Sequence, residues 1–251
     1  MESSSTFATD ETPKTIYSIP VHTLINSESA YNPISGIAPI ALNQNRFGVS
    51  YSNRYLLKET NTFLGFGSYN FKFMSLGYDA NYFGNQAFWY STQSVMIAKK
   101  LTENLSFGVA FSHTFIDQGS QYSNFNQYSP SLGLSYKPIK NWKISSVLRN
   151  ISHKQNNSFG YNDFVVAGSL FVKNIRFHAQ FEKMQNLKYQ LDFMGEYSFK
   201  KKLTFLLRTS TGNEPLSLGV EYTTQGISML FLYSYHIYLG SSPELSMYRC
   251  W

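Results

Sequence analysis

A regular alternation of side-chain size runs along the segment LSFGVAFSHTF, residues 105–115. Large residues occupy the odd positions from Leu105 to Phe115, with His113 among them, while Ser, Gly, Ala and Thr occupy the even positions. Successive side chains of a β-strand point to opposite faces, so this pattern predicts a strand with one apolar face and one small, mostly polar face. Such a strand requires an apolar environment on one side.

The same alternation returns in segments of about ten residues that are bounded by turn residues. Examples are residues 131–136 (SLGLSY), 216–222 (LSLGVEY) and 227–237 (ISMLFLYSYHI). From Arg46 to the end we expect about 14 strands, each near the ~9–11 residues that a tilted transmembrane strand needs. The sequence therefore predicts an all-β fold, a transmembrane antiparallel β-barrel.

The composition agrees with a surface that faces lipid. Aromatic residues make up 17% of the chain and charged residues only 14%, whereas about 25% charged is usual for a soluble domain. No run approaches 18 apolar residues, which excludes a helical membrane span. A soluble β-sandwich or barrel, which also alternates apolar and polar residues, stays open as the alternative.

The net charge of +6 comes largely from lysines in short turns. These are Lys99, Lys100, Lys137, Lys140, Lys173, Lys200, Lys201 and Lys202. No basic stripe with interleaved aromatic residues runs along one element, so nucleic acid is not an expected partner. The single cysteine, Cys250, cannot form an internal disulfide.

The connections between the predicted strands alternate in length. KKLTEN, KPIKN, VKN, FKKK and TTQG are short, while FIDQGSQYSNFNQY, SHKQNNSFGYND and STGNEP are longer. Outer-membrane barrels have short periplasmic turns and longer extracellular loops. With an even strand number, both termini are expected in the periplasm, and the location is the bacterial outer membrane.

Residues 1–45 lack the alternation and carry Pro13, Pro20, Pro33 and Pro39. We expect them to form a head and a lumen insert, or hatch, ahead of a barrel domain of residues 46–251. MESSSTFATDETPK has no apolar export segment, so we expect the chain to be a mature or truncated form, or its start to be misassigned.

Several stretches resemble a known family. SESAYNPISGIAP, followed by RFGVSYSNRYLL, resembles the N-terminal motif of FadL-like outer-membrane barrels, and more closely that of their short Bacteroidota relatives of the PorV and PorQ kind. AKKLTENLSFGVAFS resembles the family's periplasmic turn and following strand, and YSYHIYLGSSPELSMYRCW resembles its closing hairpin.

The resemblance implies a barrel whose N-terminal segment, with Asn32 and Pro33, folds into the lumen as the hatch. Ile34 follows Pro33 where the family has Ala. Arg249 and Cys250 precede the C-terminal Trp251, where the family prefers an aromatic residue two positions before the end. FadL transporters are far longer, so uptake of long-chain fatty acids is not carried over.

The strand faces opposite the apolar wall collect charged residues, nearly all in the second half of the chain. They are Arg149, Arg176, His178, Glu182, Asp192, Glu196, Arg208, Glu221, His236 and Glu244. Charges confined in a barrel lumen are expected to pair across strands. They form either a structural ion-pair network or the lining of a solute path.

The sequence predicts neither catalysis nor a cofactor. His178 and Glu182 lie about 13 Å apart along a strand, and no cluster with metal-ligand spacing occurs elsewhere, so no metal site is expected. Ser112 and His113 raise the possibility of a lipid-modifying hydrolase, but adjacent strand residues point to opposite faces and cannot act as a pair.

Aromatic residues near the strand ends are expected to form girdles at the two membrane interfaces. They are Tyr51, Tyr55, Tyr69, Tyr82, Phe88, Trp89, Tyr90, Phe115, Trp142, Tyr197, Tyr222 and Tyr238. The function predicted first is that of a PorV-like accessory or structural subunit of an outer-membrane secretion or assembly complex. The alternative is a FadL-like passive channel for a small hydrophobic solute. The expected partners are outer-membrane lipid and other outer-membrane or periplasmic proteins.

Overall fold

The computed structural model describes residues 45–57, 60–85, 88–117, 124–149, 151, 163–184, 189–200, 202–211, 216–236, 238 and 240–251. These residues form fourteen strands and a short 3-10 helix, η3. In chain order they are β1 (Arg46–Asn53), η3 (Arg54–Leu56), β2 (Asn61–Asn70), β3 (Ser75–Gly84), β4 (Trp89–Lys100), β5 (Leu105–Asp117), β6 (Phe125–Ile139), β7 (Trp142–Arg149), β8 (Asp163–Val172), β9 (Ile175–Met184), β10 (Gln190–Phe199), β11 (Leu203–Ser210), β12 (Leu216–Thr224), β13 (Ile227–His236) and β14 (Gly240–Cys250).

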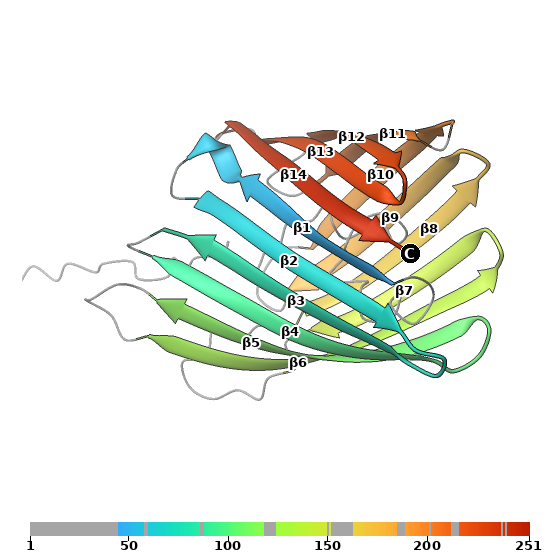
Figure 1. Ribbon diagram of the computed structural model, residues 1–251, viewed down its shortest axis with the longest axis horizontal. Coiled ribbons are helices and arrows are strands. Elements are labelled where there is room, and N and C mark those ends of the chain that lie inside the picture. The colour runs from blue at the N-terminus through green and yellow to red at the C-terminus, as the bar shows by residue number, and fades with distance from the viewer. Residues whose placement is uncertain are drawn as a thin grey trace, which may run out of the picture.

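Each strand pairs with its neighbours in the chain, all pairs are antiparallel, and β1 pairs with β14, which closes the barrel (Figure 1). Phe47 faces Arg249 across this seam. The backbone N–H of Trp251 donates to the Asn45 carbonyl oxygen at 3.1 Å. The Trp251 ring packs edge-on against Phe47, with 5.7 Å between ring centroids. The predicted all-β antiparallel barrel and its strand number are confirmed.

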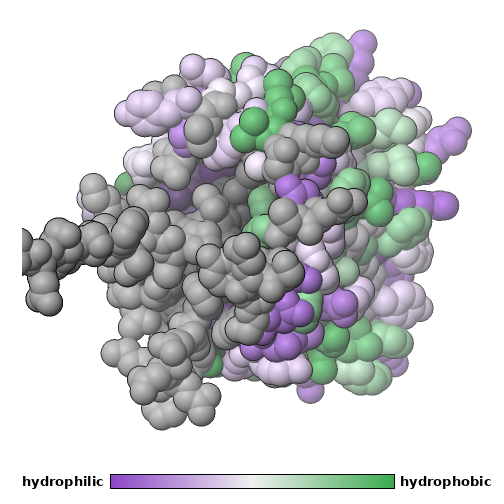
Figure 2. Space-filling model, turned by 90° about the vertical axis from the view of Figure 1, so that its left-hand side faces the viewer, coloured by the Kyte–Doolittle hydropathy of each residue, from purple (hydrophilic) through white to green (hydrophobic). Residues whose placement is uncertain are grey.

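The two faces of the wall differ as the alternation predicts. Along β13, Met229, Phe231 and Tyr233 are exposed, while the residues between them are buried. Hydrophobic residues, green in Figure 2, also lie on the wall at the right of the view onto one barrel end. Among the described residues, no helix is long and apolar enough to cross a membrane.

The connections define two ends of the barrel. The turn end carries residues 71–74, 101–104, 140–141, 173–174, 200–202 and 225–226 together with the C-terminus, and the loop end carries the connections between the other strand ends (Figure 1). The predicted segregation of short turns and longer loops is therefore confirmed. Lys173, Lys200 and Gln225 have positive φ, which produces tight reversals at the turn end.

One loop is shorter than the sequence suggested. The stretch FIDQGSQYSNFNQY was expected to be a loop throughout, but β5 continues to Asp117 and β6 begins at Phe125. Ile116 pairs with Phe125 in the ladder. Ile116 is 1% exposed and packs against Tyr90. Burial of this side chain explains why the strands extend further toward the loop end.

Gly48 on β1 allows the closest packing at the seam. A Cβ at this position would lie 2.5 Å from the Tyr248 Cβ and 2.6 Å from the Phe66 Cζ. Real side chains do not approach so closely, and a densely packed interior has no free volume for the added atom. The absence of a side chain at Gly48 therefore permits β1 to pack between β14 and β2.

We predict that Gly48→Ala destabilises the folded barrel by ~1–3 kcal/mol, the usual cost of overpacking. The matched control is Gly65→Ala on the neighbouring strand β2, because a Cβ on Gly65 meets no atom within 4 Å. Denaturant midpoints of both variants in phospholipid vesicles, read by tryptophan fluorescence, test this. Equal midpoints for the two variants would contradict it.

Candidate functional site in the barrel interior

The structure places the ten charged residues of the sequence prediction on the inward sides of their strands. Arg149 lies on β7, Arg176, His178 and Glu182 on β9, Asp192 and Glu196 on β10, Arg208 on β11, Glu221 on β12, His236 on β13 and Glu244 on β14. All are buried except Arg149 and Arg176, which are half-buried. The set therefore faces the interior along one continuous half of the wall, from β7 to β14.

Arginine and carboxylate side chains pair at several levels of this wall. Arg208 donates to Asp192 at 2.8 Å, with side-chain exposures of only 2% and 0%. Arg149 donates to Glu182, also at 2.8 Å, reaching past the intervening strand β8. Charge-assisted hydrogen bonds of this length are strong, particularly where water is excluded.

A third level, nearer the turn end, combines two bases with one acid. Arg176 Nη1 lies 3.3 Å and His178 Nε2 3.4 Å from Glu196 carboxylate oxygens. His178 Nδ1 is also 2.9 Å from the Ser169 hydroxyl on β8. Three adjacent strands, β8, β9 and β10, are thus linked across their inward faces.

The remaining predicted acids bind hydroxyl groups. The Tyr248 hydroxyl donates to Glu221. Ser50 and Ser246 donate to the same oxygen of Glu244, at 3.2 and 3.1 Å. Because β14 pairs with β1 at the seam, the Ser50–Glu244 contact adds side-chain bonding to the closure of the barrel.

Further polar residues that were not singled out from the sequence also face the interior, including charged and amide side chains. Arg46, Asp79, Lys143 and Gln180 are all buried. The alternation could have found them, since each occupies the inward register of its strand. Within the described residues, the interior charges are Arg46, Lys143, Arg149, Arg176 and Arg208 against Asp79, Glu182, Asp192, Glu196, Glu221 and Glu244. Positive and negative charges are therefore nearly balanced.

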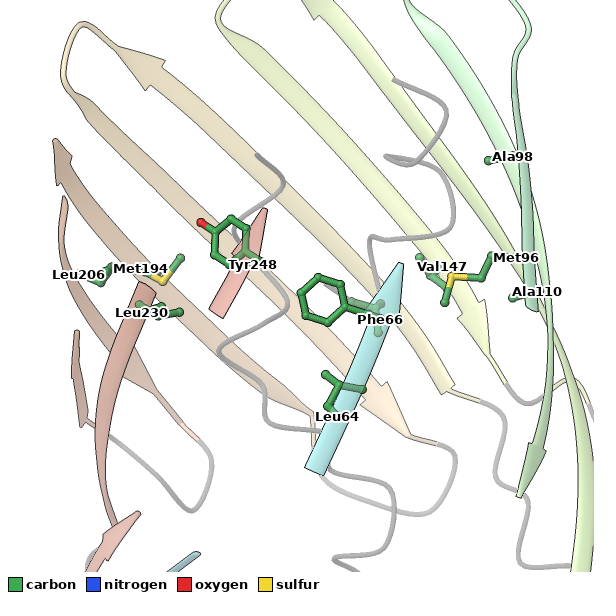
Figure 3. Packing of buried hydrophobic residues seen from close by; sticks show 11 residues of the cluster. Leu64, Phe66, Met96, Ala98, Ala110, Val147, Met194, Leu206, Leu230 and Tyr248 are labelled. Atoms are coloured by element: carbon green, nitrogen blue, oxygen red, sulfur yellow. The ribbon is translucent and has the colours of Figure 1, made fainter. Parts of the chain in front are cut away.

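The interior also contains an apolar band, which the alternation along the strands did not predict. Figure 3 shows its members projecting inward from many strands. They are Leu64, Phe66, Met96, Ala98, Ala110, Val147, Val165, Met194, Leu206, Leu230 and Tyr248. The inward face was expected to be small and polar, and this expectation is wrong where large apolar side chains occupy both registers, as in FLGF (residues 63–66) on β2.

A smaller apolar cluster lies on the inward side near the loop end. Tyr90 is 5% exposed and stacks on Phe83, with ring centroids 5.0 Å apart. Phe88 packs against the same cluster. Tyr55 packs its ring against the inward His236 instead of facing outward. The girdle prediction is therefore wrong for Tyr55, Phe88 and Tyr90, because the strand register turns Tyr90 inward and the other two rings find inward partners.

Other predicted features have a plain location. Ser112 bonds to Ser94 on the inner face, whereas His113 stacks on the exposed Tyr128 on the outer face. The two side chains therefore do not meet. The hatch motif, Asn32 and Pro33, and residues 1–44 of the predicted head and hatch lie outside the described residues. In the part of the chain that the structure describes, no three His, Cys, Asp or Glu side chains are grouped closely enough to hold a metal ion.

Comparison with known proteins supports the fold alone. No family model and no curated protein matches the sequence. Among solved structures, Omp33 of Acinetobacter baumannii is similar over 84% of this chain and 100% of its own, at 10% identity and a TM-score of 0.55. A KdgM porin is similar over 81% and 98%, at 9% identity and a TM-score of 0.48. A triple mutant of Rhodopseudomonas blastica porin is similar over 83% and 98%, at 7% identity and a TM-score of 0.47.

The similarity to Omp33 establishes that this chain has the porin-like fold of a bacterial outer-membrane β-barrel. Its low identity carries no information on solute or partner. No family is assigned, and the PorV and PorQ resemblance stays a prediction.

We predict that Arg208→Met destabilises the barrel by ~3–5 kcal/mol, because it leaves the buried Asp192 carboxylate without its cation. The double variant Arg208→Met/Asp192→Leu removes both charges and is expected to recover most of this loss. Denaturant midpoints in vesicles measure both. A double variant as unstable as the single one would show that the pair is not the source of the effect.

Proposed function

We propose that this protein is an outer-membrane barrel that acts as a PorV-like accessory or structural subunit of a secretion or assembly complex. The observation that carries the proposal is the dense network of side-chain contacts across the interior. Buried ion pairs, hydroxyl-bound carboxylates and an apolar band occupy the inner wall. Wide porins leave an aqueous channel, whereas here Asp192, Glu196 and Arg208 are almost inaccessible to solvent.

We further propose that the turn end faces the periplasm, with both termini there, so that the loop end faces outward. An exposed aromatic surface near the loop end supports a role in binding a partner. Tyr128 on β6 is 60% exposed. Its ring stacks on that of His113, with 4.7 Å between centroids, and its ring centroid lies 5.9 Å from that of Phe111. Tyrosine and other aromatic residues are enriched in protein interfaces.

The experiment is co-purification of the full chain from native outer membranes in mild detergent, with associated proteins identified by mass spectrometry. We predict recovery of a larger membrane complex in fixed proportion. Tyr128→Ser is expected to lower that recovery several-fold. Tyr136→Ser is the matched control, because Tyr136 is an exposed tyrosine near the opposite end of the same strand.

The outcome also separates this role from others. The accessory role would be overturned by two results together: the barrel is recovered without partners, and vesicles that contain it swell when placed in a small solute. Recovery in the soluble fraction would contradict a membrane location.

The second candidate is a passive route for a small hydrophobic solute. The apolar band favours this function, since Phe66, Met194 and Leu230 present an apolar surface inside the barrel. In that case, vesicles containing the protein would admit an apolar solute, and Leu230→Asp would slow its entry.

A further inference from the structure

The outer wall over β8, β9 and β10 is recessed. Gly168, Ala179 and Gly195 lie in the outward registers of these strands, and Gly168 pairs with Ala179. A Cβ placed on Gly168 or Gly195 would meet no atom within 4 Å. The adjoining outward side chains are large, so three small residues form a floor below their neighbours.

Two depressions follow from this floor. One, of about 560 Å³, includes Trp142, Phe177 and Phe193 in its sides. The other, of about 740 Å³, includes Tyr197 and Phe205. Both are bordered by Gly195 and Leu207, so they are adjacent there. We call the two adjacent depressions together the wall groove. Its lining is almost entirely carbon, which suits an alkyl chain.

The turn end below the wall groove is basic. The exposed cations among the described residues of the turn end are Lys72, Lys99, Lys100, Lys140, Lys173, Lys200, Lys202 and Arg249, and the acidic residue among them is Glu103. The Lys200 ammonium lies 5.3 Å from the centroid of the Phe199 ring, which is exposed on the outer wall. This contact holds a cation on the lipid side of the rim.

The height between the floor and the cations fits within one lipid leaflet. Lys173 follows Gly168 by five residues, and Lys200 follows Gly195 by five. At ~3.3 Å per residue each pair spans about 16 Å along its strand, which is about 12–13 Å along the membrane normal at the ~35–45° tilt of such strands. One leaflet of a bilayer contributes about 15 Å of hydrocarbon. An acyl chain in the wall groove therefore places its phosphate beside these lysines.

We propose that the wall groove binds one glycerophospholipid of the leaflet at the turn end, with an acyl chain over Gly168, Ala179 and Gly195 and its phosphate at Lys173 and Lys200. Inside a membrane, apolar contact alone gives no preference for protein over other lipids. Retention instead comes from the fit of the chain into the recess and from the attraction of lysines for an anionic headgroup. The inference does not depend on the partner role proposed above.

The test is the phospholipid content of the full chain purified from membranes in mild detergent, measured by phosphorus assay and native mass spectrometry. The unmodified protein is expected to retain one phospholipid per barrel, and Gly195→Phe, which fills the recess, is expected to lose it. Gly65→Phe is the matched control, because Gly65 faces outward on β2 with open space around it.

Heat-dependent mobility in detergent gels shows whether each variant is folded. If Gly195→Phe does not fold, the double variant Lys173→Gln/Lys200→Gln replaces it, and Lys72→Gln/Lys99→Gln on the other side of the rim is its control. A several-fold loss of bound lipid confined to the groove variants supports the site.

Two results would overturn the proposal. The first is equal lipid content in the groove variants and their controls, including no retained lipid in any of them. The second is a change of oligomeric state in Gly195→Phe with unchanged lipid content, which would assign the groove to a second copy of the chain.

Discussion

The pairing of β1 with β14 is the constraint on which the rest of the structure depends. A sheet in lipid has no water to satisfy the backbone groups of an open edge, so it must close on itself. Closure brings the two ends of the described chain together and sets the size of the interior. It also requires close packing at the seam, where Gly48 lies between Phe66 and Tyr248. The Ser50–Glu244 hydrogen bond and the Trp251–Asn45 contact add bonds across the same junction.

The outer face of this barrel was predictable because lipid makes one uniform demand on every outward position. Phe107, Val109 and Phe111 reveal their register by their size alone, and this period fixed the strand number and the direction of the inward charges. The lengths of the connections then separated the two ends. Such information is local in the chain and needs no knowledge of which strands meet.

The interior was less predictable because its residues contact one another across the closed barrel, so their partners lie far away in the sequence. That Arg149 and Glu182 face inward follows from their registers, but that they meet past β8 follows from the curvature of the barrel. Leu64 and Phe66 belong to an apolar band assembled from nine strands. The segment FLGF contains no signal that identifies the residues of the other strands that they contact. Tyr90 was misassigned for a related reason, since a large ring near a strand end suits a girdle and an inner cluster equally well.

Strands β9 and β10 carry charged side chains on their inward faces and small residues on their outward faces. On β9, the inward His178 is followed by the outward Ala179. On β10, the inward Glu196 is preceded by the outward Gly195. Charged groups inside a barrel need partners, and here those partners lie on the neighbouring strands β8–β11. The inner polar contacts and the outer recess therefore lie on opposite faces of the same strands, so the proposed lipid would sit directly outside the ion pairs of β9 and β10.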